Sequence, residues 1–196
     1  MKKGHVLFFV LCFLLLSLSP GLVYSADVVA ERPTYSEGDY WIFIGADGKS
    51  TEWRFLREEK DAFVFSKEGS EVLRDFSLMD VSRAGGFPGP MVRFPLKKGT
   101  WWKYEYSEAS PAGRGGAAGK MERIARYEAT DYEKITVAAG TFWAFKISAT
   151  VEGLFDLKKG VRQIGSATYW YAPDVKQVIK FEKGDRRWEL KEYKIK

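Results

Sequence analysis

The chain has 196 residues, of which 45% are hydrophobic, 16% aromatic and 29% charged, and its formal net charge is +5. Acidic and basic residues are interspersed and the basic excess is small, so the composition argues against a nucleic-acid-binding protein. The only histidine, His5, and the only cysteine, Cys12, both lie near the N-terminus.

The N-terminus has the pattern of a secretory signal peptide. Two lysines precede an apolar run from Val6 to Leu18, and small residues follow it. The run is shorter than the ~20 apolar residues that a spanning helix needs, and Val23 and Ser25 suit cleavage before Ala26. We expect residues 1–25 to be removed and the chain to be periplasmic or extracellular, with no transmembrane span left.

Loss of this segment removes His5 and Cys12 and therefore several chemistries. Disulfides, a thiolate nucleophile, a zinc site built on Cys or His, and a serine–histidine pair are all excluded for the mature chain. Without Lys2 and Lys3, the 31 basic residues become 29 against 26 acidic ones, a net charge of +3. We expect no cofactor and no metal, and one domain over residues 26–196.

Alternation with a period of two dominates the mature chain. The clearest case places Trp143, Phe145 and Ile147 on one face of a strand. Turn sequences at 46–49, 67–70, 137–140 and 182–185 separate such segments. The pattern predicts an all-β fold: an antiparallel meander of about ten strands that forms a strongly curved sheet, a half-barrel or a two-layer sandwich.

In chain order, an N-terminal meander (39–76), a Gly/Pro-rich connection (77–99) and a C-terminal antiparallel sheet (100–195) are expected. Segment 70–79 is ambiguous, because Val72, Phe76 and Met79 have helical spacing and a short helix is the alternative to a strand. The last strand changes phase after Leu190, which predicts a bulge near Lys191 or Glu192. We expect strands at 39–45, 50–57, 61–66, 70–76, 100–107, 120–136, 141–151, 161–172, 176–183 and 186–195.

Catalytic motifs are weak. Gly113 to Lys120 is glycine-rich like a phosphate loop, but its spacing is wrong and Met121 replaces the magnesium-binding Ser or Thr. A pair of carboxylates would need neither His nor Cys, yet Asp47, Glu52 and Asp156 have no distinguishing context. We therefore do not expect an enzyme.

Aromatic residues give the stronger indication of function. Adjacent aromatics such as Trp101 and Trp102 must point to opposite faces of a strand, as must Trp170 and its neighbours. Either protein covers both faces, or aromatics line an open concave surface that binds a ligand. The candidate ligand-binding residues are Trp102, Tyr104, Trp143, Phe145 and Trp170, of which the first four are expected to line a cavity.

Two segments resemble a known group of proteins. The sequence VAAGTFWAFKI at 137–147, followed by YWYAPDVKQVIKFE at 169–182, is similar to a pattern in uncharacterised exported β-rich envelope proteins of bacteria, grouped with domain-of-unknown-function families. The resemblance covers about the last hundred residues, starting at LKKGTWWKYEY. It implies a periplasmic or surface β-domain and carries no catalytic residue.

These observations favour an exported, non-catalytic binding protein of the bacterial envelope. Its ligand would be apolar or lipid-like and would lie on an aromatic concave face of the sheet. Two alternatives stay open: a protein-interaction module of an envelope complex, and a glycan-binding or glycan-processing protein that uses carboxylates.

Overall fold

The computed structural model describes residues 28–78, 89–110, 119–154 and 161–196. Most of them belong to strands, and one short 3-10 helix, η1, follows β10. The elements are β1 (Val29–Ala30), β2 (Tyr40–Gly45), β3 (Ser50–Glu59), β4 (Ala62–Lys67), β5 (Ser70–Asp75), β6 (Leu96–Lys97), β7 (Trp101–Ser110), β8 (Gly119–Val137), β9 (Gly140–Leu154), β10 (Val161–Ala172), η1 (Pro173–Val175), β11 (Gln177–Lys183) and β12 (Arg186–Lys194).

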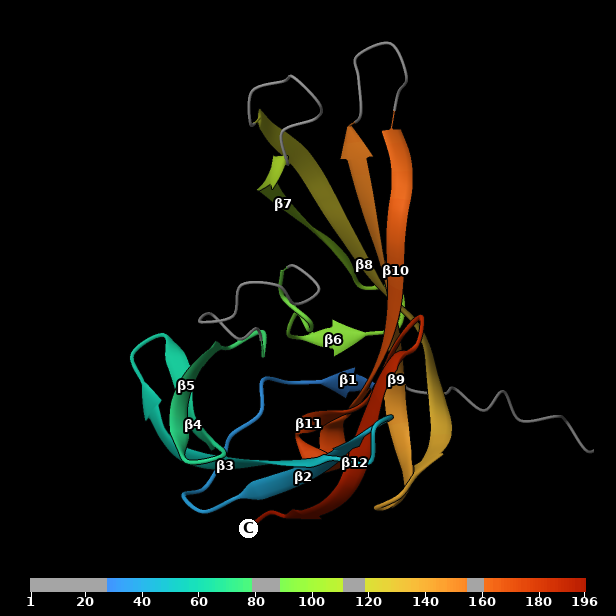
Figure 1. The fold of residues 1–196 in the computed structure, drawn as a ribbon. Coiled ribbons are helices and arrows are strands. Elements are labelled where there is room, and N and C mark those ends of the chain that lie inside the picture. Colours follow the sequence, from blue (N-terminus) through green and yellow to red (C-terminus); the bar gives the residue numbers. More distant parts are fainter. Residues whose placement is uncertain (1–27, 79–88, 111–118, 155–160) are drawn as a thin grey trace, which may run out of the picture.

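Ten strands form one antiparallel sheet in the order β5-β4-β3-β2-β12-β11-β10-β9-β8-β7. The β2–β12 pair, with Trp41 opposite Tyr193, joins the N-terminal meander to the C-terminal strands. Figure 1 shows that the sheet is strongly curved and that the small β1–β6 pair lies within the curve. Among the described strands, β5 and β7 do not pair with each other, so the sheet stays open and these two strands are its edges.

The all-β prediction is confirmed, in its form of a strongly curved sheet. The ambiguous segment begins as a strand, β5, and the described residues after it turn at Leu78, whose φ is +63°, without forming a helix. The predicted bulge is confirmed as well, since the β12–β2 register shifts between Leu190 and Glu192. No described helix is long and apolar enough to cross a membrane.

Aromatic side chains fill the curve of the meander. Tyr35 lies among the rings of Trp41, Phe55, Phe63 and Phe65, with centroid distances of 4.9 to 5.5 Å. Most of these contacts are edge-on, the geometry that the charge distribution of aromatic rings favours.

Two hydrogen bonds fasten this aromatic cluster to the turn after β10. The Tyr35 hydroxyl donates to the Lys176 carbonyl at 2.7 Å, and the Trp41 indole N–H donates to the Val175 carbonyl at 2.9 Å. Both polar tips are thereby satisfied within the protein, and the meander is tied to η1 and the start of β11.

Candidate functional site

An open hollow of about 570 Å³ lies where four segments meet. These are the chain after β1, the end of β5, the segment at 90–95 that leads into β6, and the start of β7. Its lining combines apolar and charged side chains: Glu31, Arg32, Asp75, Phe76, Ser77, Pro90, Val92, Arg93, Phe94, Pro95, Trp102 and Lys103.

Three aromatic rings of the hollow are held by the core behind them. Trp102 is 2% exposed and stacks on Tyr127 at 5.3 Å, with the ring planes only 2° apart. Phe94 packs edge-on against Tyr171 at 5.3 Å, and Phe76 packs against Phe63 at 4.9 Å. The apolar part of the hollow is therefore already formed before any ligand arrives.

Hydrogen bonding and a glycine place the segment at 90–95 against β7. The Trp102 indole N–H donates to the Pro90 carbonyl at 2.8 Å. Gly89, with φ +89°, comes so close to Tyr104 that an added Cβ would lie 2.7 Å from that side chain. A larger residue at this position would push the segment off the strand, so Gly89 is needed for the wall of the hollow.

Most charges at the rim already have partners. Arg32 lies over the Phe76 ring, with 4.2 Å from its Cζ atom to the ring centroid, and pairs with Glu58 at 3.3 Å. Lys103 pairs with Glu105 at 2.7 Å, outside the hollow. Asp75 accepts hydrogen bonds from the backbone N–H and the hydroxyl of Ser77.

Arg93 and Glu31 differ from these residues, because neither forms an ion pair with any other residue that the structure describes. Arg93 is exposed and keeps all its guanidinium donors available at the rim. Of the three cations in the lining, Arg32 and Lys103 are neutralised by acids outside it, which leaves Arg93 as the cation available to a ligand.

The structure separates the five aromatic residues that the sequence singled out. Trp102 lines the hollow, whereas Phe145 is fully buried against Tyr132, 4.6 Å away. Trp143 is 48% exposed and stacks on the same Tyr132 at 5.4 Å. Tyr104 is 36% exposed beside the hollow, without lining it. A role for these residues in ligand binding stays a prediction.

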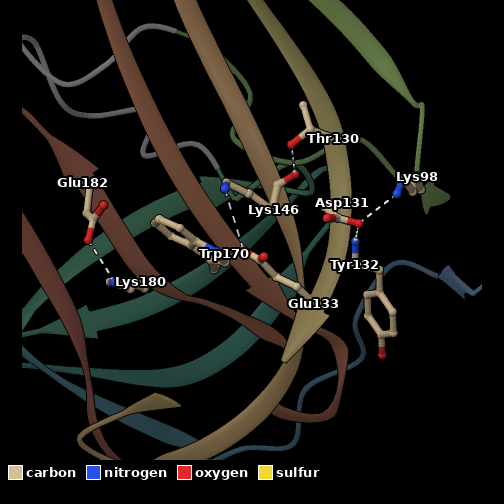
Figure 2. Close-up of polar contacts among 9 residues, drawn as sticks. All are labelled: Lys98, Thr130, Asp131, Tyr132, Glu133, Lys146, Trp170, Lys180 and Glu182. Carbon is tan, nitrogen blue, oxygen red and sulfur yellow. Dashed lines mark hydrogen bonds and ion pairs between the residues drawn. The ribbon is translucent and has the colours of Figure 1, made fainter. Parts of the chain in front are cut away.

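Trp170 lies on the opposite face of β10 from Tyr169 and Tyr171, and protein side chains cover it (Figure 2). Its indole N–H donates to the Glu133 carboxylate at 2.9 Å. The ammonium groups of Lys180 and Lys146 lie 4.8 and 6.0 Å from the ring centroid. Only 7% of Trp170 is exposed, so little of its ring is available to a ligand.

Of the residues that line the hollow, only Trp102 was singled out from the sequence, and those missed include Arg32, Phe76, Arg93 and Phe94. They lie just outside the regular strands, where alternation of apolar residues gives no indication. Long connections often carry functional side chains, and the sequence FPGPMVRFP at 87–95 combines such a connection with two Phe-Pro pairs and an arginine. That combination is the sequence feature that could have indicated Arg93 and Phe94 as site residues.

The candidate acids and metal ligands form no site among the residues that the structure describes. Within the part of the chain that the structure describes, no three metal-ligating side chains cluster. Asp47 accepts a hydrogen bond from the Lys49 backbone N–H, and Glu52 pairs with Arg54 at 2.7 Å, as expected for solvated acids. The expected signal peptide at 1–25, Asp156 and most of the glycine-rich segment at 113–120 lie outside the described residues.

The sheet and the hollow together define a class: an open, curved antiparallel β-protein with a charged, aromatic hollow on its inner side. No protein-family model and no curated protein matches the chain. Among solved structures, the hypothetical lipoprotein YmcC from Escherichia coli is similar at a TM-score of 0.44 and 10% identity. That likeness covers 79% of this chain and 82% of YmcC.

Two further solved structures are similar at the same level. A presumed exported protein with a YmcC-like fold from Bacteroides fragilis has a TM-score of 0.41 and 13% identity, over 84% of this chain and 99% of that one. A presumed lipoprotein from Parabacteroides distasonis has a TM-score of 0.43 and 15% identity, over 86% and 100%. Likenesses of this size do not establish a shared function, which has to be argued from this chain's own residues.

Proposed function

We propose that the protein is a non-catalytic binding protein that holds an amphipathic, lipid-like molecule in the hollow. The observation that carries this proposal is the hollow itself, an opening of about 570 Å³ with aromatic rings fixed in its lining. Small-molecule sites commonly have volumes of roughly 300–1,000 Å³, apolar linings and a few convergent polar groups.

The chemistry of the lining supports a ligand with two parts. An apolar chain would lie against Phe76 and Phe94, with the nearly buried Trp102 behind them, where its burial removes hydrocarbon surface from water. A polar end would reach the rim, where the Arg93 guanidinium offers a fork of donors that suits a carboxylate or phosphate.

The N-terminal sequence supports a location for the protein. We infer that the protein acts in the bacterial envelope, because the first 25 residues have the pattern of a cleaved signal peptide. Amphipathic molecules are abundant at membrane surfaces, so this location would bring the proposed ligand within reach.

A titration with dodecanoate tests the proposal, measured by isothermal calorimetry on the processed protein below the micelle concentration. We expect saturable binding of one chain per hollow and at least about tenfold weaker binding to Arg93→Ala, since a charge-assisted bond is worth ~1.5–3 kcal/mol. Arg186→Ala, which changes an exposed arginine on the β11–β12 turn, is the matched control.

Two outcomes would count against the proposal. Dodecanoate binding that Arg93→Ala and Arg186→Ala weaken equally would show nonspecific attraction to cations. Absence of saturable binding to dodecanoate and to a neutral chain of the same length, dodecanol, would show that the hollow does not take hydrocarbon chains.

A further inference from the structure

β7 is a ten-residue strand with an open side. It pairs with β8 on one side only and forms one edge of the main sheet, as the order of the described strands shows. Trp101 is 64% exposed and Tyr104 is 36% exposed on this strand. An edge of this length offers a row of backbone donors and acceptors to another strand.

The backbone at the start of β7 determines which residues direct those groups outward. Gly99, with φ +83°, donates its N–H to the Ala129 carbonyl at 2.8 Å, and Ala129 donates back to Thr100 at 2.9 Å. This is the pattern of a bulge with glycine in its first position. Because hydrogen-bonding direction alternates along a strand, the even-numbered residues from Thr100 onward bond to β8.

The odd-numbered residues consequently direct their backbone N–H and C=O groups to the open side of β7. The first four in the order of the strand are Trp101, Lys103, Glu105 and Ser107. These are the groups that an added antiparallel strand would bond.

The charges of this strand complement themselves in one register. Two identical strands that pair antiparallel about a two-fold axis are centred on one residue. A centre at Lys103 or at Glu105 places that charge opposite its own copy, which is unfavourable. A centre at Tyr104 instead places Lys103 opposite Glu105 twice.

Neighbouring pairs in the register centred on Tyr104 are also compatible. On the face that carries Lys103, each Trp101 lies opposite a Ser107, which leaves room for the large indole. On the inner face, Trp102 lies opposite Tyr106, and the two Tyr104 side chains meet at the axis. Aromatic cross-strand pairs of this kind stabilise antiparallel sheets.

We propose that β7 pairs with β7 of a second copy of this chain in the register centred on Tyr104, which makes the protein a symmetric dimer with one continuous sheet. In the isolated chain, Lys103 pairs with Glu105 of its own strand at 2.7 Å, and both side chains are exposed. Such exposed pairs contribute little to stability, so exchanging the one pair of each copy for two equivalent pairs across the seam costs little.

The other edge strand lacks this self-complementarity. In β5, a centre at Leu73 places Glu71 opposite Asp75, a pair of like charges, and a centre at Val72 places Glu71 opposite Leu73. Glu71 is moreover engaged by Arg57, 2.8 Å away on β3. The two edges therefore differ, and the dimer is expected to stop at two copies. Trp102 and Lys103 belong both to this seam and to the lining of the hollow, but the pairing of the two strands does not require a bound ligand.

Charge reversal at the seam tests the dimer by sedimentation equilibrium on the processed protein. Lys103→Glu places acids opposite each other at two points, and we expect the dimer dissociation constant to rise at least about tenfold. Glu105→Lys should do the same. The double variant Lys103→Glu with Glu105→Lys restores opposite charges and is expected to dimerise again, which a merely misfolded single variant could not explain.

Cross-linking tests the register. The mature chain is expected to contain no cysteine, so Tyr104→Cys introduces a single thiol at the two-fold axis, where mild oxidation should link two copies. Ser107→Cys is the matched control, because its copies would be about 20 Å apart at ~3.4 Å per residue. A protein that stays monomeric, a dimer that Lys103→Glu leaves unchanged, or equal cross-linking of both cysteine variants would overturn the proposal.

Discussion

Trp170 shows how a strand with aromatic residues on both faces satisfies each of them. Tyr169 and Tyr171 are buried on one side of β10, and the Trp170 ring lies on the other side under Lys146 and Lys180. Its N–H reaches Glu133 on β8, with β9 between them in the sheet. The ammonium groups of the two lysines lie over the ring and pair with Glu133 and Glu182.

Substitutions of Trp170 should distinguish what the ring contributes to stability from what its hydrogen bond contributes. Trp170→Ala removes a nearly buried ring, and we expect the free energy of unfolding to fall by about 3–5 kcal/mol. Trp170→Phe keeps an aromatic surface for the lysines and loses the bond to Glu133, at a cost of about 1 kcal/mol. Urea unfolding followed by far-UV circular dichroism measures both; equal losses would show that the ring contributes nothing beyond its N–H.

At the scale of elements, the strands could be predicted because their sequence alternates. The face assignments of β9 and β10 and the bulge after Leu190 follow from residue order, since each strand residue reverses its side chain. The hollow could not be predicted in this way. Its residues come from the chain after β1, the end of β5 and the turn after it, the segment at 90–95 and the start of β7, which are brought together by long-range packing and have no common period.

The cavity expected from Trp102, Tyr104, Trp143 and Phe145 illustrates the difference. All four are placed on a face by alternation, but alternation does not say what else packs there. Phe145 lies under the neighbouring strands, whereas Trp143 lies near the end of the β8–β9 hairpin, beyond the last β9 residue paired with β10. Distance along the curved sheet therefore separates residues whose local patterns are the same.

Arg74 joins two distant elements and gives a test at this scale. Its buried guanidinium donates to the Leu78 carbonyl and to the Gln177 side-chain oxygen, 3.2 Å away on β11. Arg74→Leu would leave these buried acceptors without that donor, and we expect a loss of about 3 kcal/mol in the free energy of unfolding.

Arg57→Leu is the control for this experiment. Arg57 lies on the same meander but pairs with Glu59 and Glu71 on the exposed surface. Such pairs are screened by water and salt, so its loss should change the urea midpoint little. If both variants unfolded at the same urea concentration, the buried contact between β5 and β11 would not be important for stability.

Across the whole molecule, buried tyrosines connect the fold to alkaline pH. Burial raises the pKa of Tyr127, Tyr169 and Tyr171 above the ordinary value, and burial together with the nearby Glu108 raises the pKa of Tyr106 to about 12. In the unfolded chain these hydroxyls would ionise near pH ~10. The folded state therefore holds protons that the unfolded state has already released.

The sign of the pH dependence follows from this difference. Below the unfolded pKa both states are protonated and the full stability is present; as pH rises from about 10 towards 12, proton release favours the unfolded state and stability falls. We expect the urea midpoint to decrease steadily over this window, and Tyr106→Phe to reduce the slope by removing one such group. Tyrosine absorbance at high pH provides an independent measurement, and the buried hydroxyls should ionise only as the sheet unfolds. Complete ionisation near pH ~10 in a protein that still unfolds cooperatively would instead show that these side chains are open to solvent.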